Sequence, residues 1–330
     1  MGDSLTFTGP ATDRNPGARV WAVVLAGGEG SRLAALTHDA EGVPVPKQYC
    51  SLTGGATLLE DTLQRARRCA PADRVAVIVS ERHRRWWRRV LPSAHDGHAV
   101  VQPTNRGTAV GLLLSALSIA DVDPLARLVF LPCDHYVRDE ALIDEALRHA
   151  SSAPLPAGEL ILLGVAPEEA DPGLGYIMPR TPYAAHELPY VERFIEKPSP
   201  AVAADLVARG ALWNTFMFAA AATTVIGLVR ARFPEIVDSL ESALAAGPAA
   251  VAALYERLPS VDFSRDVLEG AVARMRVLPV ASCGWCDLGT PRRVAAWARQ
   301  TQHWRPASTR PPAGGSVCLT AAIAFAPEGT

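Results

Sequence analysis

The sequence predicts an α/β fold: a doubly wound, mostly parallel sheet followed by a smaller α+β part. Two observations carry this prediction. From about residue 20 to about residue 150, short apolar segments typical of buried strands alternate with helical segments, and this order is typical of parallel sheets. From Pro154 onward, strands and helices follow one another without that regular alternation, which indicates a second part of mixed structure.

Three regions are expected along the 330 residues. Residues 1–19 are polar and contain Gly and Pro, so we expect a flexible leader rather than a secretory signal. Residues 20–304 are expected to form the folded domain, with halves at about 20–150 and 151–304. Residues 305–315 are rich in Pro, Gly, Ser and Thr, which predicts that 305–330 is a linker-like tail with one edge strand at 317–326.

The composition argues against several classes of function. The net charge is −2, so nothing global favours nucleic acid or an acidic membrane as a partner. No apolar run approaches the roughly 20 residues of a transmembrane helix. The six cysteines are scattered, unlike a secreted disulfide framework, and Cys283-Gly-Trp-Cys286 comes too late in the chain for a thioredoxin-like motif. We therefore expect a cytoplasmic protein without nucleic-acid or membrane partners.

The first half is expected to contain four strands, each followed by a helix. The strands are expected at 23–25, 74–79, 98–102 and 125–131, and the helices at 56–70, 81–91, 110–120 and 140–150. The helix at 81–91 combines arginines with two tryptophans, a composition that is open to a nucleic-acid interpretation. We favour a helix with Trp86 and Val90 turned inward, because the rest of the chain supplies no basic surface to extend it.

The second half is expected to mix strands and helices. The expected strands are at 160–165, 190–195 and 276–280. Residues 171–177 are expected to form a turn and a short extended piece, and 213–218 an extended aromatic segment. The expected helices are at 201–209, 221–232, 236–246, 249–258, 261–273 and 291–302.

A glycine turn ends the first strand and is typical of a phosphate-binding loop. The run from Leu25 to Arg32 reads Leu-Ala-Gly-Gly-Glu-Gly-Ser-Arg, and Lys47 follows after a loop. Glycines let backbone N–H groups approach a phosphate, and the two cations add fixed positive charge. A dinucleotide-binding dehydrogenase is disfavoured, because its second strand should end in an acidic residue roughly 20 residues past the glycines.

Two further points along the first half predict a ligand at the same edge of the sheet. The order strand, turn, helix at 98–120 places Gly107 and Thr108 at a helix N-terminus with unpaired N–H groups. Asp134 follows the strand at 125–131, and open α/β sheets bind ligands outside the carboxyl ends of their strands.

Eight motifs in one order resemble a known family. The chain resembles the sugar-1-phosphate nucleotidyltransferases and, within them, the mannose-1-phosphate guanylyltransferases. The resemblance covers about residues 20–297 and is carried by the segments 25–33, 46–48, 102–109, 132–135, 175–177, 194–198, 213–218 and 284–289. It implies a Rossmann-like, glycosyltransferase-A-like nucleotidyltransferase fold. It also implies transfer of a nucleotidyl group from GTP to mannose 1-phosphate, with release of pyrophosphate, Mg²⁺ (or Mn²⁺) as the cofactor, and a homodimer as one possible assembly.

The resemblance also implies roles for individual residues. Arg32, Lys47 and Asp134 would be catalytic, and Asp134 and Asp287 would hold the metal ion. The sugar 1-phosphate would be bound by Gly175, Glu196, Lys197 and Asn214. The nucleotide would be bound by Leu25, Ala26, Gly27, Gly28, Gly30, Ser31, Arg32, Gln102, Gly107 and Thr108.

Departures from the family pattern leave two alternatives open. The segment from Leu33 to Pro46 is about four residues longer than the family pattern, and Thr215-Phe216 stands where Ser-Gly is usual. Gly270 stands where a lysine is common. One alternative is therefore the same reaction with another sugar or base. The other is a catalytically silent homologue that senses nucleotide or sugar.

Overall fold

The computed structural model describes residues 19–34, 36–39, 41–51, 55–91, 98–183, 188–301 and 317–318. Nearly all of the expected leader, and most of the expected tail, lie outside these residues. Of the tail, the structure describes β11 (Val317–Cys318), which pairs in parallel with β2 (Cys50–Ser51). The rest of the predicted strand at 317–326 lies outside the described residues.

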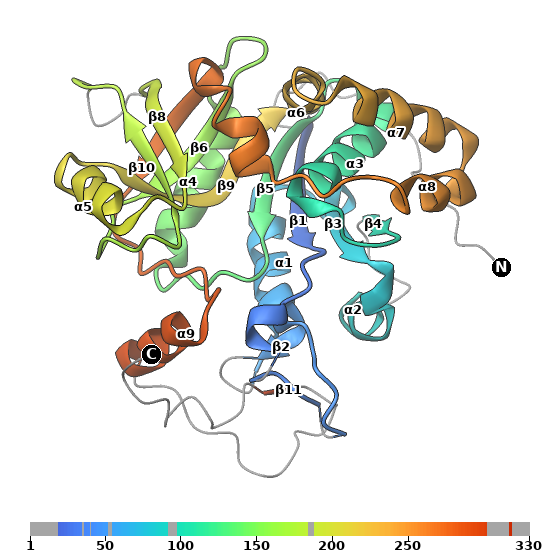
Figure 1. The fold of residues 1–330 in the computed structure, drawn as a ribbon, viewed down its shortest axis with the longest axis horizontal. Helices are drawn as coiled ribbons and strands as arrows, with labels where there is room; N and C mark the ends of the chain where they lie inside the picture. Colours follow the sequence, from blue (N-terminus) through green and yellow to red (C-terminus); the bar gives the residue numbers. More distant parts are fainter. Residues whose placement is uncertain are drawn as a thin grey trace.

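One mixed sheet runs through both halves of the described chain (Figure 1). Its main path has the strand order β10-β6-β9-β5-β1-β3-β4. These strands are β1 (Val20–Ala26), β3 (Val75–Ser80), β4 (His98–Gln102), β5 (Arg127–Pro132), β6 (Leu160–Val165), β9 (Leu212–Ala221) and β10 (Met275–Val280). The pairs β5–β1, β1–β3, β3–β4 and β10–β6 are parallel. The predicted doubly wound, mostly parallel sheet is confirmed.

The antiparallel strand β9 joins the two halves of the sheet. It pairs with β5 on one side and with β6 on the other. It also pairs with β7 (Gly175–Pro179), which pairs in turn with β8 (Val191–Glu196). Because β9 lies between the two sets of parallel strands, residues expected at the sugar phosphate are built onto the same sheet as the glycine loop.

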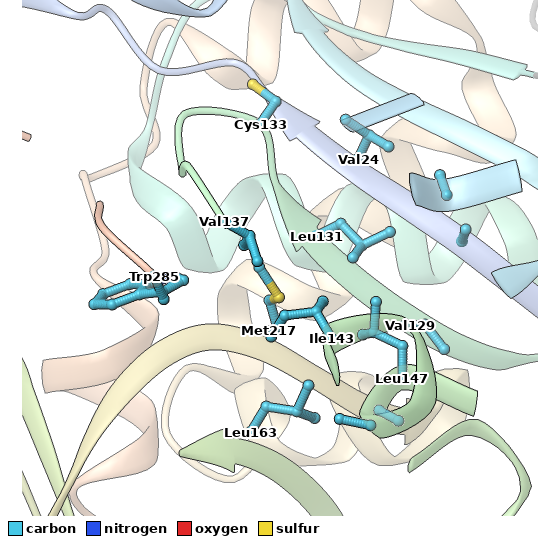
Figure 2. Close-up of a cluster of buried hydrophobic side chains, with 14 of the residues drawn as sticks. Val24, Val129, Leu131, Cys133, Val137, Ile143, Leu147, Leu163, Met217 and Trp285 are labelled. Atoms are coloured by element: carbon cyan, nitrogen blue, oxygen red, sulfur yellow. The ribbon is translucent and has the colours of Figure 1, made fainter. Parts of the chain in front are cut away.

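Helices cover both faces of the sheet (Figure 1). Residues of α1 and α4 belong to one apolar cluster, and residues of α3, α6, α7 and α8 belong to the cluster on the other face. Figure 2 shows part of the first cluster, where Val24, Leu131, Met217 and Ile143 meet. The helices are α1 (Leu58–Cys69), α2 (Arg84–Val90), α3 (Gly107–Val122), α4 (Glu140–Ser152), α5 (Pro200–Ala208), α6 (Ala222–Arg230), α7 (Pro234–Ala246), α8 (Pro248–Tyr255) and α9 (Pro291–Thr301).

Local sequence accounts for several element ends. At the start of α1, Thr57 and Glu60 form a reciprocal capping box, which satisfies two backbone donors of the first turn. In α2, Trp86 and Trp87 are both buried, and Arg85 and Arg89 lie over the Trp86 ring. The inward orientation expected for Trp86 is confirmed, and the arginine stems cover the tryptophans.

The prediction of a helix at 261–273 is wrong. The structure has a single π-helical turn at Phe263–Leu268 and a short 3-10 turn at Val272–Arg274. Val261 cannot start a helix because its backbone bonds to another segment: its N–H donates to Arg106 O, and its carbonyl accepts from Ala109 N. The side chain of Asp262 then caps the turn by accepting from Arg265 N.

Within the described residues, no helix combines the length and the apolar character needed to cross a membrane.

Candidate active site

The glycine loop leaves the carboxyl end of β1 and is held in place by the segment that carries Lys47. The Gln48 amide nitrogen donates to Ala26 O at 3.1 Å and to Gly28 O at 2.7 Å. Gly30 has φ +64°, and a Cβ there would lie 3.0 Å from Lys47 N. Glycine is therefore needed both for the turn and for this close approach. Gln48 stands within the 46–48 motif, but no role was predicted for it, because a side-chain bond across 20 residues leaves no periodic signal.

Lys47 is a buried cation whose partners are all oxygens. Its side chain is 8% exposed, and Nζ lies 2.8 Å from Asp134 Oδ2. Nζ also donates to Leu288 O at 3.2 Å and to Asp287 O at 3.4 Å. The structure thus brings together three residues predicted at the reacting phosphates (Lys47, Asp134 and Asp287) although Asp287 is 240 residues from Lys47.

Asp134 follows β5 and stays ionised in a crowded site. Desolvation, the largest single effect, raises the pKa of its carboxyl group. The charge and the hydrogen bond of Lys47 act mainly in the opposite direction, and the net pKa is lowered. The side chain is 34% exposed, so a ligand can still reach it. Beside it, burial lowers the pKa of His135, which favours the neutral ring.

His135 is oriented by Trp285. The Trp285 indole N–H donates to His135 Nδ1 at 3.3 Å, and the two rings pack edge to face. Because Nδ1 is the acceptor, the proton of the neutral ring is assigned to Nε2. Nε2 lies 3.6 Å from Asp134 Oδ1, so this N–H faces the carboxylate. No role for His135 was predicted, although it stands directly after Asp134 in the 132–135 motif.

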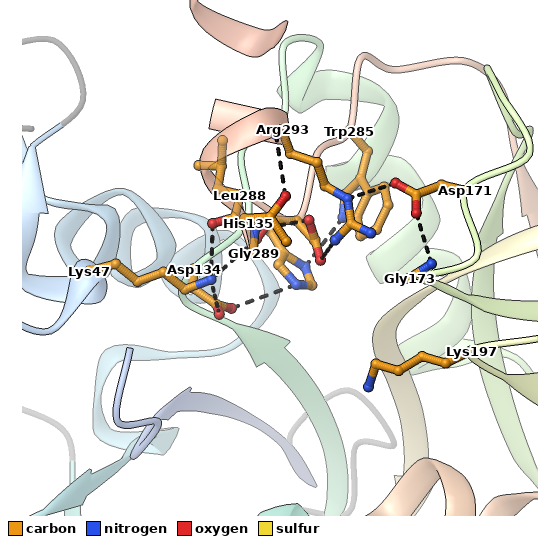
Figure 3. A network of polar contacts seen from close by, with 12 residues as sticks. Lys47, Asp134, His135, Asp171, Gly173, Lys197, Trp285, Leu288, Gly289 and Arg293 are labelled. Atoms are coloured by element: carbon orange, nitrogen blue, oxygen red, sulfur yellow. Dashed lines mark hydrogen bonds and ion pairs between the residues drawn. The ribbon is translucent and has the colours of Figure 1, made fainter. Parts of the chain in front are cut away.

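Asp287 is held by an arginine that the sequence did not reveal. Arg293 Nη1 donates to Asp287 Oδ2 at 2.6 Å, and Arg293 Nε donates to Asp171 Oδ2 at 2.8 Å (Figure 3). The other oxygen of Asp287 accepts from Gly289 N at 3.0 Å. The carboxylate of Asp287 is therefore engaged at both oxygens by its own chain.

The N-terminus of α3 is packed against a distant segment. Gly107 has φ +83°, and a Cβ there would lie 2.2 Å from Val261 O. The hydroxyl of Thr108 accepts from Phe263 N at 2.8 Å. Gln102, at the end of β4, is buried. Its amide group lies against Gly27 and Gly111, the positions where a Cβ would meet it. Gly107 and Thr108 thus have structural partners, whereas Gln102 Oε1 is buried without a hydrogen-bond partner among the described residues. Base reading by the three residues stays a prediction.

The residues expected to bind the sugar phosphate lie where β7, β8 and β9 meet. Gly175 pairs with Glu196 across the β7–β8 ladder, and a Cβ at Gly175 would lie 3.3 Å from Asn214 Cβ. Lys197 Nζ lies 2.9 Å from Glu196 Oε1 and is 43% exposed at the side chain. The ammonium group of Lys197 is turned toward the side on which Lys47 and Asp134 lie (Figure 3). Arg32, in the turn after the glycine loop, is exposed.

Residues with strained, positive-φ backbones lie at or beside this site. Among the described residues, the non-glycine positions with positive φ are Lys197 (50°), Phe216 (56°) and Leu288 (46°). Lys197 belongs to the expected sugar-phosphate pocket, and Leu288 binds Lys47. Phe216 follows Asn214, whose Oδ1 accepts from Phe216 N at 3.0 Å. Strained conformations of this kind tend to occur at functional sites, and here Phe216 takes the φ that the usual glycine would adopt freely.

A family model matches most of the chain. The model described as nucleotidyl transferase matches residues 21–303. The chain belongs to the nucleotidyl transferase family. The family resemblance expected from the motifs is thereby confirmed.

Relatives within the family carry related names. Over 290 residues, the chain is 30% identical to a Salmonella typhimurium protein named mannose-1-phosphate guanylyltransferase RfbM, covering 81% of this chain and 56% of that protein. Over 284 residues, it is 32% identical to the xanthan biosynthesis protein XanB of Xanthomonas campestris pv. campestris, covering 81% and 57%. The chain thus spans about half the length of these relatives.

A solved structure shares the fold. It comes from Thermus thermophilus and is described as mannose-1-phosphate geranyltransferase. It is 32% identical in sequence, with a TM-score of 0.74, and the match covers 84% of this chain and 79% of that one.

The carboxylates of a nucleotidyl transferase site can be tested for their fit to Mg²⁺. Within the described residues, no group of three or more His, Cys, Asp and Glu side chains could hold a metal ion. Mg²⁺ needs only one or two protein carboxylates when substrate phosphates supply further oxygens. Asp134 contacts Lys47 through its carboxylate, whereas Asp287 contacts Lys47 through its main-chain carbonyl and turns its carboxylate to Arg293 and Gly289 N. Each carboxylate oxygen keeps a lone pair beyond the bond it accepts. The donor set therefore fits Mg²⁺ or Mn²⁺ in the presence of substrate.

Proposed function

We propose that this chain transfers a nucleotidyl group from a nucleoside triphosphate to a sugar 1-phosphate, with GTP and mannose 1-phosphate as the preferred pair. The observation that carries the proposal is the convergence of Lys47, Asp134 and Asp287 at the carboxyl ends of the sheet, with Lys197 turned toward them. The name of the Salmonella relative supports both GTP and mannose 1-phosphate, and the description of the Thermus structure supports mannose 1-phosphate.

The chemistry asks the site to bring two anions together. A phosphate oxygen of the sugar 1-phosphate attacks the α-phosphorus in line, the bond from that phosphorus to the bridging oxygen breaks, and pyrophosphate leaves. Catalysis then consists of orientation and charge stabilisation. No covalent nucleophile is required, so the buried oxygen-bound lysine suits the task better than a reactive thiol or hydroxyl would.

The nucleotide side combines the glycine loop with two cations. The loop from Leu25 to Ser31 presents backbone N–H groups to the triphosphate, and the exposed Arg32 closes on its oxygens. Lys47 is fixed in advance by Asp134 and the carbonyl of Leu288, so little reorganisation is needed when it meets the α-phosphate. Gln102, Gly107 and Thr108 border the expected base site.

Asp134 and Asp287 would hold Mg²⁺ or Mn²⁺ between the chain and the substrate phosphates. When bound, the metal ion supplies positive charge that offsets the charge developing on the phosphate oxygens. Asp134 stays ionised because its pKa is lowered, and this ionised form is the one that a cation requires.

The sugar side is built from the β7–β8–β9 junction. Glu196 accepts hydrogen bonds from sugar hydroxyls, and Lys197 pairs with the sugar's phosphate. Gly175 leaves room beside Asn214, so the sugar ring can approach the sheet. Phe216 is the observation that favours a second candidate function, transfer to a different sugar, because its side chain replaces the usual glycine directly after this pocket.

The test is a purified protein assayed for pyrophosphate release with Mg²⁺ over a panel of triphosphates and sugar 1-phosphates. We expect GTP with mannose 1-phosphate to be the fastest pair and Asp134→Asn to abolish turnover. Preference for UTP or dTTP would contradict the guanylyl assignment, and preference for another sugar would support the second candidate. Binding of GTP without turnover on any pair would instead identify a silent homologue.

A further inference from the structure

Arg293 is a buried side chain shared between two aspartates from distant parts of the chain. It extends from α9, is 10% exposed, and reaches Asp171 at 2.8 Å and Asp287 at 2.6 Å. Desolvation lowers the pKa of its guanidinium group, but the bonds to Asp171 and Asp287 outweigh this effect and raise it. Both aspartates are largely buried as well, so the three charges depend on one another.

Each aspartate is also bound to the backbone of its own turn. Asp171 Oδ1 accepts from Gly173 N at 2.8 Å, and Asp287 Oδ1 accepts from Gly289 N at 3.0 Å. A planar guanidinium with fixed donors therefore sets the orientation of two turns at once. Figure 3 shows Arg293 between Asp171 on one side and the Leu288–Gly289 segment on the other.

The two turns lead to opposite ends of the proposed reaction. The turn after Asp287 carries the carbonyl of Leu288, which accepts from Lys47 Nζ. The turn after Asp171 leads to Leu174, whose carbonyl accepts from Lys197 N at 3.2 Å. A continuous path of bonds thus joins Lys47 to Lys197, and Arg293 is at its centre.

We propose that Arg293 is a positioning residue that fixes the distance between the Lys47–Asp287 side of the site and the Lys197 side. Its kinetic consequence rests on the proposed function, whereas its mechanical consequence does not. Without Arg293, the turns at Asp171 and Asp287 lose their shared partner and move independently. In-line attack then occurs from a wider range of geometries, which lowers kcat and raises KM for the sugar 1-phosphate.

The neighbouring Arg292 provides a matched control. It lies on the same helix and carries the same charge, but its side chain is 71% exposed and pairs with Glu169 at the surface. Exposed ion pairs contribute little to stability. Comparing Arg293→Met with Arg292→Met therefore distinguishes the effect of losing the buried charge at position 293 from the effect of losing any one positive charge on α9.

The first experiment measures amide hydrogen exchange in the ligand-free protein, which requires no turnover. We expect Arg293→Met to accelerate exchange at both the Gly173 and the Gly289 amides by roughly tenfold or more, because each loses a charge-assisted bond whose carboxylate is no longer held. Arg292→Met should leave both amides unchanged. Faster exchange at only one amide, at neither, or equally in both variants would overturn the proposal.

The second experiment measures kcat and KM for the same variants. We expect Arg293→Met to lower kcat and to raise KM for the sugar 1-phosphate, with KM for GTP unchanged. If Arg293→Met does not fold, Arg293→Lys replaces it. A lysine keeps the charge but lacks the two-pronged fork, so in this variant, unlike Arg293→Met, faster exchange at one of the two amides is the expected result. Unchanged exchange at both amides of Arg293→Lys would overturn the proposal. A wild-type protein without turnover would overturn the proposed function, while the exchange result would still decide the role of Arg293.

Discussion

Lys47 and Lys197 flank the proposed reaction, and the structure holds them in opposite ways. Lys47 has an 8% exposed side chain with three oxygen partners. Lys197 is 43% exposed and pairs with its chain neighbour Glu196. The ammonium group of Lys47 is therefore positioned before any ligand arrives, whereas the more exposed side chain of Lys197 can turn to its ligand although its backbone is held by Leu174 O. The difference suggests that the nucleotide side of the site is rigid and the sugar side adaptable.

The surroundings explain why each arrangement is tolerated. A buried ammonium group is costly unless oxygens replace its water shell, and Asp134 and the carbonyls of Asp287 and Leu288 do so for Lys47. Lys197 keeps much of its water shell and gains little from Glu196, since exposed pairs contribute roughly 0–1 kcal/mol. A rigid cation suits a reacting centre, where reorganisation slows catalysis.

The largest expected effect comes from removing Lys47. We expect Lys47→Met to lower kcat by about 10²–10³, the loss typical of one preorganised donor at a developing charge. Steady-state kinetics with saturating GTP and sugar phosphate measure it. Lys47→Arg is the control: it keeps the charge but not the fit between Asp134 and Leu288, so activity should stay low. Full activity in Lys47→Arg would show that the rigid geometry is unnecessary.

A smaller effect is expected at Lys197. We expect Lys197→Ala to raise KM for the sugar 1-phosphate by roughly tenfold, because one charged hydrogen bond to phosphate contributes about 1.5–3 kcal/mol and exposure reduces it. Added salt should raise the KM for the sugar 1-phosphate more in the wild type than in the variant, because salt screens the attraction between Lys197 and the phosphate. A raised KM for GTP with an unchanged KM for the sugar phosphate would reverse the assignment of the two lysines.

The fold was predictable because its signals are local. The strand–helix alternation and the glycine turn after β1 depend on neighbouring residues, and so does the acidic residue after β5. The π-helical turn at Phe263–Leu268 was not predictable, because the backbone of Val261 is bound to the start of α3. That bond joins segments far apart in the sequence, and no pattern within 261–273 reveals it.

The residues of the candidate site were proposed from the motifs, whereas their partners are seen only in the fold. The motifs supplied Lys47, Asp134 and Asp287, and the structure brings them together. Arg293 lies 122 residues from Asp171, so only the fold reveals that it joins Asp287 to Asp171. Likewise, the hydroxyl of Thr108 binds Phe263 N, although its position at a helix N-terminus suggested that it was free for a ligand.

Acid should affect the Lys47 side of the site through His135. Burial lowers the pKa of His135 below its usual 6.5, so the unfolded chain binds more protons than the folded one as pH falls through that value. The free energy of unfolding should therefore decrease on acidification below about pH 6.5. His83 and His98 act in the same direction, because burial lowers their pKa values as well.

The contribution of His135 to this pH dependence is measured by comparing the wild type with a variant that lacks the histidine. Urea unfolding of the wild type and of His135→Gln between about pH 5 and pH 7.5 should give a shallower pH dependence in the variant. An identical dependence would mean that His135 does not titrate on unfolding.

The smallest expected effect distinguishes the two lysines by their backbones. Lys197 has φ +50°, a conformation that costs an L-residue about 1–2 kcal/mol and costs glycine almost nothing. We therefore expect Lys197→Gly to be more stable than Lys197→Ala by up to about 1 kcal/mol in urea unfolding, after the extra chain entropy of glycine is subtracted.

Lys47 provides the control for this prediction. It begins a 3-10 turn and is not among the positions with positive φ, so Lys47→Gly should be less stable than Lys47→Ala, by about 0.5–1 kcal/mol. Opposite signs at the two sites would show that Lys197 is held in a strained backbone as well as an open side-chain environment. If the Gly variant is less stable than the Ala variant at both sites, backbone strain does not distinguish the two lysines, and only the exposure of their side chains does.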